Sequence, residues 1–415
     1  MRIGRGVVAG FIFLVMGAGV RADEGCSQER LKVVAEKVKA GRGELLGVSV
    51  GYGGTDTGVP VATQNLIRGF KDSLAATADA FMDCERGGAG DAKGIETRLA
   101  DLLGAGAGDS VRKPAGELVV TDQGRDKIYG ANLQIAARAE EHEPPLIGFK
   151  IGFDIPCGMD EMLLIYQSSG NGWRRMIRWQ SDPYSQISGA FGDFFEYAVF
   201  GERRGDDWRV AVAHGKPWCS SSSSGFDLDV LRPATGAIAS QQTVFHKEAA
   251  YWRDMDSTMR GEPDGFELRL NVTSLSSRSD RKVAIYHYRL HQGQLHRYQP
   301  VAENARDFLD EWIQADWNEA AEWTARNSLG SLGKEHEIIA DMMNAREESS
   351  RPELSYGAVQ ACSGKQKMVQ VELNGAPTGW FKYFQIEQGK DSFTLVSGSN
   401  APDPKCTGPD LMGGH

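Results

Sequence analysis

The sequence predicts an α+β protein that is mainly antiparallel β, with an N-terminal helical segment and a helical insertion. Two observations favour this class. Apolar residues recur at helical spacing up to about residue 104, and beyond about residue 117 the apolar period changes to two. Short glycine-containing turns separate these later segments, which is typical of hairpins in a sandwich or a propeller-like array.

The first 22 residues have the pattern of a secretory signal peptide. Arg2 and Arg5 precede an apolar and glycine run over residues 7–20, and the small residue Ala22 follows. A helix of that length is about 21 Å long, shorter than the roughly 30 Å apolar core of a bilayer. We therefore expect cleavage near Ala22 and a secreted or periplasmic protein with no membrane span in the mature chain.

Residues 23–104 are expected to form a helical segment. Ser27 can cap a first helix that stops at Gly41. A second helix begins at Thr63 and ends near Cys84, with the apolar stripe Leu66, Phe70, Leu74, Thr77 and Phe81. A third candidate helix holds Ile95, Leu99, Leu102 and Leu103.

A linker over residues 105–116 and an antiparallel β domain over residues 117–300 follow. The linker is inferred from its small, polar and flexible composition. Apolar and polar residues alternate over 195–199, 208–212 and 266–272. Such alternation predicts strands with one buried face.

Residues 301–350 are expected to form the helical insertion, with Asn304 as the cap of its first helix. Residues 351–415 supply the C-terminal strands, which we expect at 367–374, 380–386 and 392–397. These strands are expected to complete the β domain. The alternative is a separate C-terminal β unit.

Six cysteines predict three disulfides, because their number is even, none forms a C-x-x-C pair and the leader directs the chain to an oxidising compartment. The expected pairs lie in sequence order and each falls within one compositional region: Cys26–Cys84, Cys157–Cys219 and Cys362–Cys406. Antiparallel packing of the first two helices would bring the first pair within bonding distance.

The net charge of −10 argues against nucleic acid as the main partner, since phosphate binding requires a basic face. A small molecule, a glycan or a protein remains as the expected partner.

The second disulfide would gather polar residues at one corner of the sheet. They come from two segments that are far apart in the sequence: Asp154, Asp160, Glu161, His214, Trp218, Asp227 and Asp229. Carboxylates can coordinate a hard cation such as calcium, and an indole can hold a sugar ring. These residues are the candidate ligand or cation site.

We assign no catalytic motif. The glycine-rich stretch 48–56 lacks the Gly-Lys-Ser/Thr of a phosphate loop, and His336-Glu337 lacks the second histidine of a zinc protease motif. The leading expectation is a non-enzymatic extracytoplasmic binding or interaction protein. The alternative is a secreted hydrolase or a cation-dependent carbohydrate-binding protein that uses the loop cluster around Cys157 and Cys219. The hydrolase would combine His214, the serine run 220–224, and Asp227 or Asp229.

Overall fold

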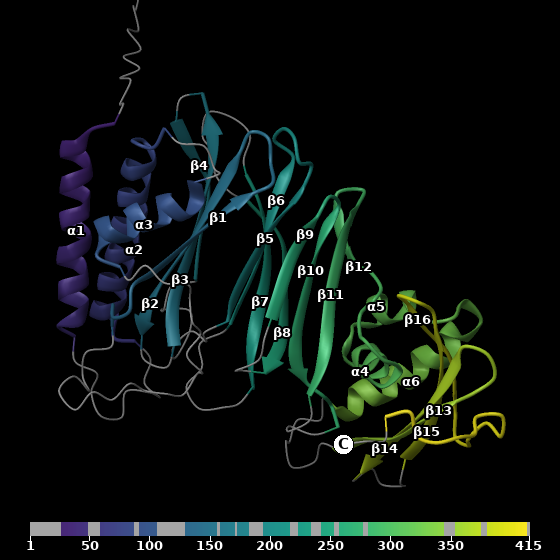
Figure 1. Cartoon of the computed structure of the whole chain (residues 1–415). Helices are drawn as coiled ribbons and strands as arrows, with labels where there is room; N and C mark the ends of the chain where they lie inside the picture. Colours follow the sequence, from purple (N-terminus) through teal and green to yellow (C-terminus); the bar gives the residue numbers. More distant parts are fainter. Residues whose placement is uncertain are drawn as a thin grey trace, which may run out of the picture.

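The computed structural model describes most of the chain. The described residues are 26–48, 59–86, 91–105, 129–155, 158–170, 172–181, 194–215, 223–233, 242–252, 257–276, 281–343, 353–374 and 380–412. These residues form four antiparallel sheets, each of four strands in sequence order, and two groups of helices (Figure 1). The predicted α+β, mainly antiparallel class is confirmed.

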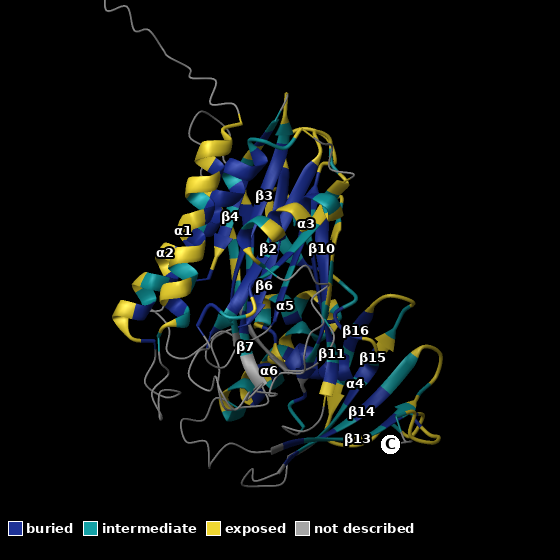
Figure 2. Ribbon diagram, turned by 60° about the vertical axis from the view of Figure 1, so that its left-hand side comes forward, coloured by how far each residue is buried: buried dark blue, intermediate teal, exposed yellow. Residues whose placement is uncertain are grey.

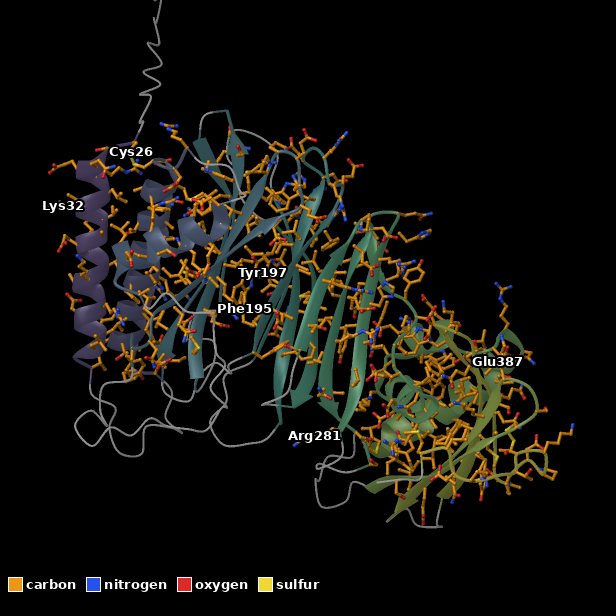
Figure 3. The ribbon with its side chains drawn as sticks, viewed as in Figure 1. Cys26, Lys32, Phe195, Tyr197, Arg281 and Glu387 are labelled. Carbon is orange, nitrogen blue, oxygen red and sulfur yellow. A yellow bond between two sulfur atoms is a disulfide. The ribbon has the colours of Figure 1, made fainter. Side chains whose placement is uncertain are left out.

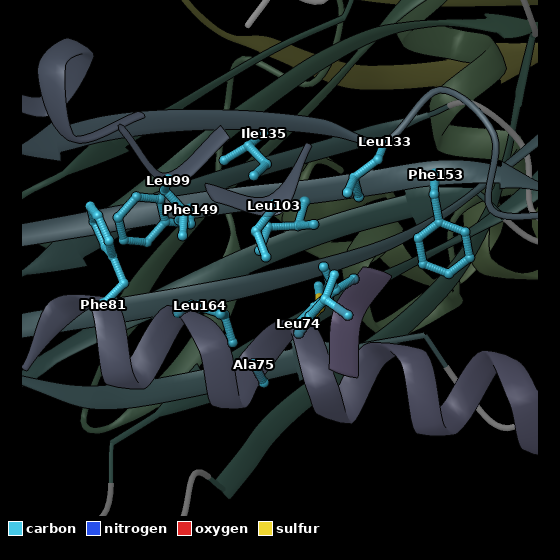
Figure 4. Close-up of a cluster of buried hydrophobic side chains, with 14 of the residues drawn as sticks. Leu74, Ala75, Phe81, Leu99, Leu103, Leu133, Ile135, Phe149, Phe153 and Leu164 are labelled. Atoms are coloured by element: carbon cyan, nitrogen blue, oxygen red, sulfur yellow. The ribbon is translucent and has the colours of Figure 1, made fainter. Parts of the chain in front are cut away.

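Three helices lie on one side of the first sheet, where two of them contact its strands and the first helix packs on the other two. The helices are α1 (Gln28–Leu46), α2 (Val61–Met82) and α3 (Ala92–Leu103). The strands are β1 (Gln134–Glu140), β2 (Leu146–Ile155), β3 (Gly158–Ser169) and β4 (Gly172–Gln180). Figure 4 shows the apolar side chains that meet there, from Phe81 and Leu74 of α2 to Phe153 of β2. Figure 2 shows the outward side of α1 exposed, as expected for a helix with one buried face.

The first helix begins as predicted and ends later. Ser27 caps it by accepting a hydrogen bond from the backbone N–H of Arg30 at 3.2 Å. The predicted stop at Gly41 is wrong, because the helix continues to Leu46. Leu45 is fully buried, and its burial in the core offsets the poor helix propensity of glycine.

The second and third sheets complete a stack of three. The second contains β5 (Phe195–Gly201), β6 (Trp208–Gly215), β7 (Ser223–Arg232) and β8 (Gln242–Trp252). The third contains β9 (Ser257–Glu262), β10 (Gly265–Thr273), β11 (Arg281–His291) and β12 (Gln294–Arg297). One apolar cluster joins the second sheet to the first, and another joins it to the third. Every residue of β6 is therefore buried, and Phe195 and Tyr197 lie between the first two sheets (Figure 3).

The C-terminal part builds its own core. Three helices, α4 (Ala305–Gln314), α5 (Trp317–Glu322) and α6 (Leu329–Met343), precede the fourth sheet. Its strands are β13 (Glu353–Ala361), β14 (Gln366–Asn374), β15 (Trp380–Gln388) and β16 (Phe393–Ser399). These strands pair with one another and pack on the helices. Among the described strands, these four form a sheet of their own. Asn304 caps α4 as predicted, by accepting a hydrogen bond from Asp307 N at 3.0 Å.

A buried network of charges joins the third sheet to α4. Lys282 of β11 and Arg297 of β12 both bind Glu311 of α4, at 2.6 Å and 2.5 Å. Lys282 also binds Asp310. All four side chains are at most 5% exposed. This network and the surrounding packing fix α4 against the sheet stack.

Two of the three predicted disulfides are confirmed. Cys26–Cys84 joins the start of α1 to the end of α2, and Cys362–Cys406 lies in the C-terminal part. The Cys157–Cys219 pair, the leader over residues 1–22 and most of the linker over 105–116 lie outside the described residues. None of the described helices is long and apolar enough to cross a membrane.

Candidate functional site

Part of the predicted polar cluster lies on one face of the second sheet. His214 of β6 stands opposite Asp227 of β7, and Asp229 stands opposite His246 of β8. Directly opposed residues, and residues two apart on a strand, share a face of an antiparallel sheet. The four side chains therefore project from the face that packs against the first sheet. We call these four residues the His–Asp cluster.

Asp229 is the centre of the His–Asp cluster. Its carboxylate contacts Nε2 of His214 at 3.3 Å and Nδ1 of His246 at 2.9 Å, and it accepts a hydrogen bond from the Trp179 indole at 3.2 Å. Burial raises the pKa of Asp229, but the hydrogen bonds from the two histidines outweigh burial and hold the pKa below its ordinary value. Asp229 is therefore a carboxylate at neutral pH.

His214 is the most enclosed histidine of the cluster. It is 7% exposed, and its ring centroid lies 4.5 Å from that of Trp179. Since Nε2 donates to the Asp229 carboxylate, Nδ1 carries the lone pair in the neutral ring. This Nδ1 is buried and has no hydrogen-bond partner within the described part of the chain. A carboxylate that orients an imidazole is the arrangement of a general base.

Two further predicted residues belong to the first sheet. Glu161 of β3 pairs with Lys150 of β2 at 3.3 Å, and Lys150 also donates to the carbonyl oxygen of Phe195 at 3.0 Å. Asp154, at the end of β2, accepts a hydrogen bond from the Asn132 amide. Glu161 therefore reaches the second sheet through Lys150.

Asp160 lies on the opposite face of β3 from Glu161, toward the helices. It is fully buried and binds Lys71 of α2 and Ser181, each at 2.8 Å. Lys71 also donates to Ser181 at 2.9 Å. Adjacent residues of a strand point to opposite faces, so Asp160 and Glu161 cannot both join one site. The Asp160 contacts hold α2 to the first sheet.

The predicted metal site was compared with the arrangement of the described side chains. Among the described residues, no group of three or more His, Cys, Asp or Glu side chains is placed to hold a metal ion. The His–Asp cluster also offers imidazole nitrogens, whereas calcium takes oxygen ligands. Trp218, the predicted indole of the site, lies outside the described residues together with both cysteines of the second disulfide. Calcium binding stays a prediction.

One short segment matches a catalytic motif in sequence but not in structural context. Residues 47–51 read Gly-Val-Ser-Val-Gly, which matches the G-x-S-x-G pattern of a nucleophile elbow. An elbow requires a strand before the serine, but α1 ends at Leu46, directly before the pattern. Ser49 itself lies outside the described residues. The preceding helix is the wrong context for an elbow.

A second candidate site, which the sequence did not reveal, is an open cavity of about 930 Å³ in the C-terminal part. Its lining residues come mainly from the end of α4, the start of α5 and one side of α6. Its apolar lining comes from Leu275, Ile313, Trp317, Leu329, Ala340 and Met343. We call it the α4–α6 cavity.

His336 is the polar group built into the wall of the α4–α6 cavity. It is 7% exposed, and its Nε2 atom lies 3.1 Å from the carbonyl oxygen of Trp312 and 3.0 Å from that of Ala315. Carbonyl oxygens only accept, so Nε2 carries the proton. Burial lowers the pKa of His336, while the two backbone hydrogen bonds oppose this change. The ring is therefore neutral at neutral pH, with a lone pair on Nδ1.

Glycines on α6 leave room beside this histidine. A Cβ at Gly333 would lie 3.0 Å from Cζ2 of Trp317, so the glycine lets the indole lie close against the helix. A Cβ at Gly330 would meet no atom within 4 Å, and Gly330 lines the cavity. Glycine within a helix costs about 1 kcal/mol relative to alanine. Gly330 and Gly333 precede His336 in the same helix, and this unfavourable pair of helical glycines was the sequence signal that could have pointed to the cavity.

No protein-family model, curated protein or solved structure matches the chain. The geometry of these two sites is therefore the basis for a function.

Proposed function

We propose that the protein is an extracytoplasmic binding protein that holds a small molecule in the α4–α6 cavity. The observation that carries the proposal is the cavity itself, which is about 930 Å³ in volume, is lined by both apolar and polar residues, and has the buried His336 fixed in its wall. Small-molecule sites are commonly concave and about 300–1,000 Å³ in volume, with a few fixed polar groups that orient the ligand.

The location outside the cytoplasm is supported by the cysteines and by the first residues. Disulfides such as Cys26–Cys84 and Cys362–Cys406 persist in oxidising compartments. The charged start, apolar run and small residue of positions 1–22 are typical of a cleaved secretory leader. We therefore place the protein in the periplasm or the extracellular space.

The test is a fluorescence titration with N-phenyl-1-naphthylamine, an uncharged apolar dye. The wild-type protein should bind the dye at one saturable site, and Gly330→Leu should weaken binding at least tenfold, since leucine at this position extends along the cavity wall. Ala340→Leu fills the same wall from farther along α6 and should act in the same direction.

Gly43→Leu is the matched control. Gly43 also lies within a helix and is exposed, and a Cβ there would meet no atom within 4 Å. The gain in helix propensity is thus the same as at Gly330, and dye binding should not change. Equal binding by the Gly330→Leu and Gly43→Leu proteins, or no saturable binding to the wild type, would overturn the proposal.

A second candidate function is acid–base hydrolysis at the His–Asp cluster, favoured by the buried, unbonded Nδ1 of His214 and the contact of Nε2 with Asp229. The purified protein should then turn over an ester, peptide or glycoside substrate, with loss in His214→Gln and Asp229→Asn. His291→Gln, at an exposed histidine at the end of β11, is the control. Unchanged turnover in both cluster variants would discard this function.

A further inference from the structure

One edge of the His336 ring has no hydrogen bond. Two backbone carbonyls occupy the Nε2–H donor, and no described residue hydrogen-bonds to Nδ1. A nitrogen lone pair can only accept a hydrogen bond in the neutral ring. A ligand that meets this atom must therefore bring an N–H or O–H donor, because an acceptor-only group would face lone pair against lone pair.

The wall beside His336 is aromatic. The Trp317 and His336 ring centroids are 5.4 Å apart, and Gly333 lets the indole lie against α6. Trp317 is half-buried and lines the cavity, so part of its surface is available to a ligand. Aromatic side chains favour offset-stacked or edge-to-face contact with other rings, which adds to the gain from apolar burial.

The rim of the cavity carries a net negative charge. Asp316 and Glu337 are carboxylates and Lys334 is a cation, and all three are exposed and line the cavity. Their sum is negative, as is the charge of the whole chain. A ligand with a negative charge is disfavoured by this rim.

From these three observations we infer that the α4–α6 cavity recognises a planar aromatic molecule with an N–H or O–H donor on its ring edge and no negative charge. The inference rests on the proposed function, whose ligand class it names. In this complex the ring packs against Trp317, and the donor bonds to Nδ1 of His336.

The test is isothermal titration calorimetry of the full chain with indole, 1-methylindole and indole-3-acetate. Indole should bind, and methylation of its nitrogen should weaken binding about tenfold, since one desolvated hydrogen bond is lost. The negatively charged acetate should bind more weakly than indole.

Two substitutions at His336 separate its nitrogens. His336→Gln can place an amide N–H near the Nε2 position, which keeps the bonds to the backbone carbonyls, but it has no acceptor at the δ position. It should bind indole and 1-methylindole equally. His336→Asn can place an amide oxygen near the δ position and should retain the preference for indole.

The outcomes separate this inference from the proposed function. Equal binding of indole and 1-methylindole to the wild type overturns the inference. An undiminished preference of His336→Gln for indole over 1-methylindole also overturns it. Neither result changes the expected effect of Gly330→Leu on dye binding, which tests the proposed function. Binding of neither compound also overturns the inference, and the dye titration then decides separately whether the cavity is a ligand site.

Discussion

The Nε2 atom of His336 in α6 lies 3.0 Å from the carbonyl oxygen of Ala315, the residue that directly follows α4. This hydrogen bond, with the one to Trp312, connects two helices at the wall of the α4–α6 cavity. It also assigns the proton to Nε2 and leaves the lone pair on Nδ1. The stability of this junction and the proposed ligand binding of the cavity therefore depend on the same neutral imidazole.

The first prediction concerns the loss of stability at acidic pH. The folded state lowers the pKa of His336, so below the ordinary value of about 6.5 the unfolded chain binds more protons at this residue. The contribution of His336 to stability is thus complete above that value and is lost as the pH falls through the folded pKa. Urea unfolding at several pH values should show a smaller decline between about pH 7.5 and 5 for His336→Gln than for the wild type. Equal declines in the unfolding free energy of the wild type and of His336→Gln would contradict the lowered pKa of His336.

The second prediction concerns the contact between the first two sheets. A Cβ at Gly148 of β2 would lie 2.5 Å from Oη of Tyr197 on β5, closer than real side chains approach. Gly148→Ala should therefore cost about 1–3 kcal/mol of unfolding free energy. Tyr197→Phe removes the clashing oxygen and should recover part of this loss in the double variant.

Gly69→Ala is the control for Gly148→Ala. Gly69 lies within α2, where a Cβ would meet no atom within 4 Å. Alanine there should be neutral or stabilising by up to about 1 kcal/mol. A Gly148→Ala protein as stable as the wild type in chemical denaturation would show that the two sheets are not packed as described.

The third prediction concerns the buried charges beside α4. Glu311→Gln leaves Lys282 and Arg297 with less negative charge in a buried site, and should cost about 3–5 kcal/mol. Burial raises the pKa of Glu311, but the two cations outweigh burial and lower it from 4.5 to about 2. The stability that Glu311 contributes is therefore present above pH 4.5 and is lost as the pH falls toward 2.

The exposed pair of Glu36 and Lys39 on α1 provides the matched comparison for Glu311→Gln. Glu36→Gln should change the unfolding free energy by less than about 0.5 kcal/mol, because solvent screens surface pairs. If both glutamine variants cost the same in thermal or urea unfolding, the Glu311 network is not the buried junction described.

The fourth prediction concerns the disulfides. Peptide mapping without reduction should recover Cys26–Cys84 and Cys362–Cys406, together with Cys157–Cys219, the predicted pair outside the described residues. Removing the first pair with alanine should cost about 3–4 kcal/mol, through the entropy of the unfolded chain. Alkylation of any of these cysteines without prior reduction would contradict the pairing.

Local signals predicted several elements correctly. Ser27 and Asn304 were identified as helix caps because capping depends on a side chain and backbone groups only three residues away. The end of α1 was not predictable from Gly41, because the helix is extended by the burial of Leu45 against distant residues. Tertiary packing decided that boundary.

The candidate site was predictable only in part, because strand register is a tertiary property. His214, Asp227 and Asp229 were identified, but their partner His246 was not, since it meets Asp229 only through the register of β7 with β8. Asp160 was grouped with Glu161 by proximity in sequence, although a strand directs the two side chains to opposite faces. The α4–α6 cavity was missed because it requires the packing of three helices.

The most direct test of the central claim is the position of a bound ligand. Crystals of the full chain soaked with 5-bromoindole should give one anomalous bromine peak, beside Trp317 and His336 in the α4–α6 cavity. The same soak with Gly330→Leu crystals should give no peak there. A bromine peak at another surface of the wild-type protein, with none in this cavity, would contradict the account.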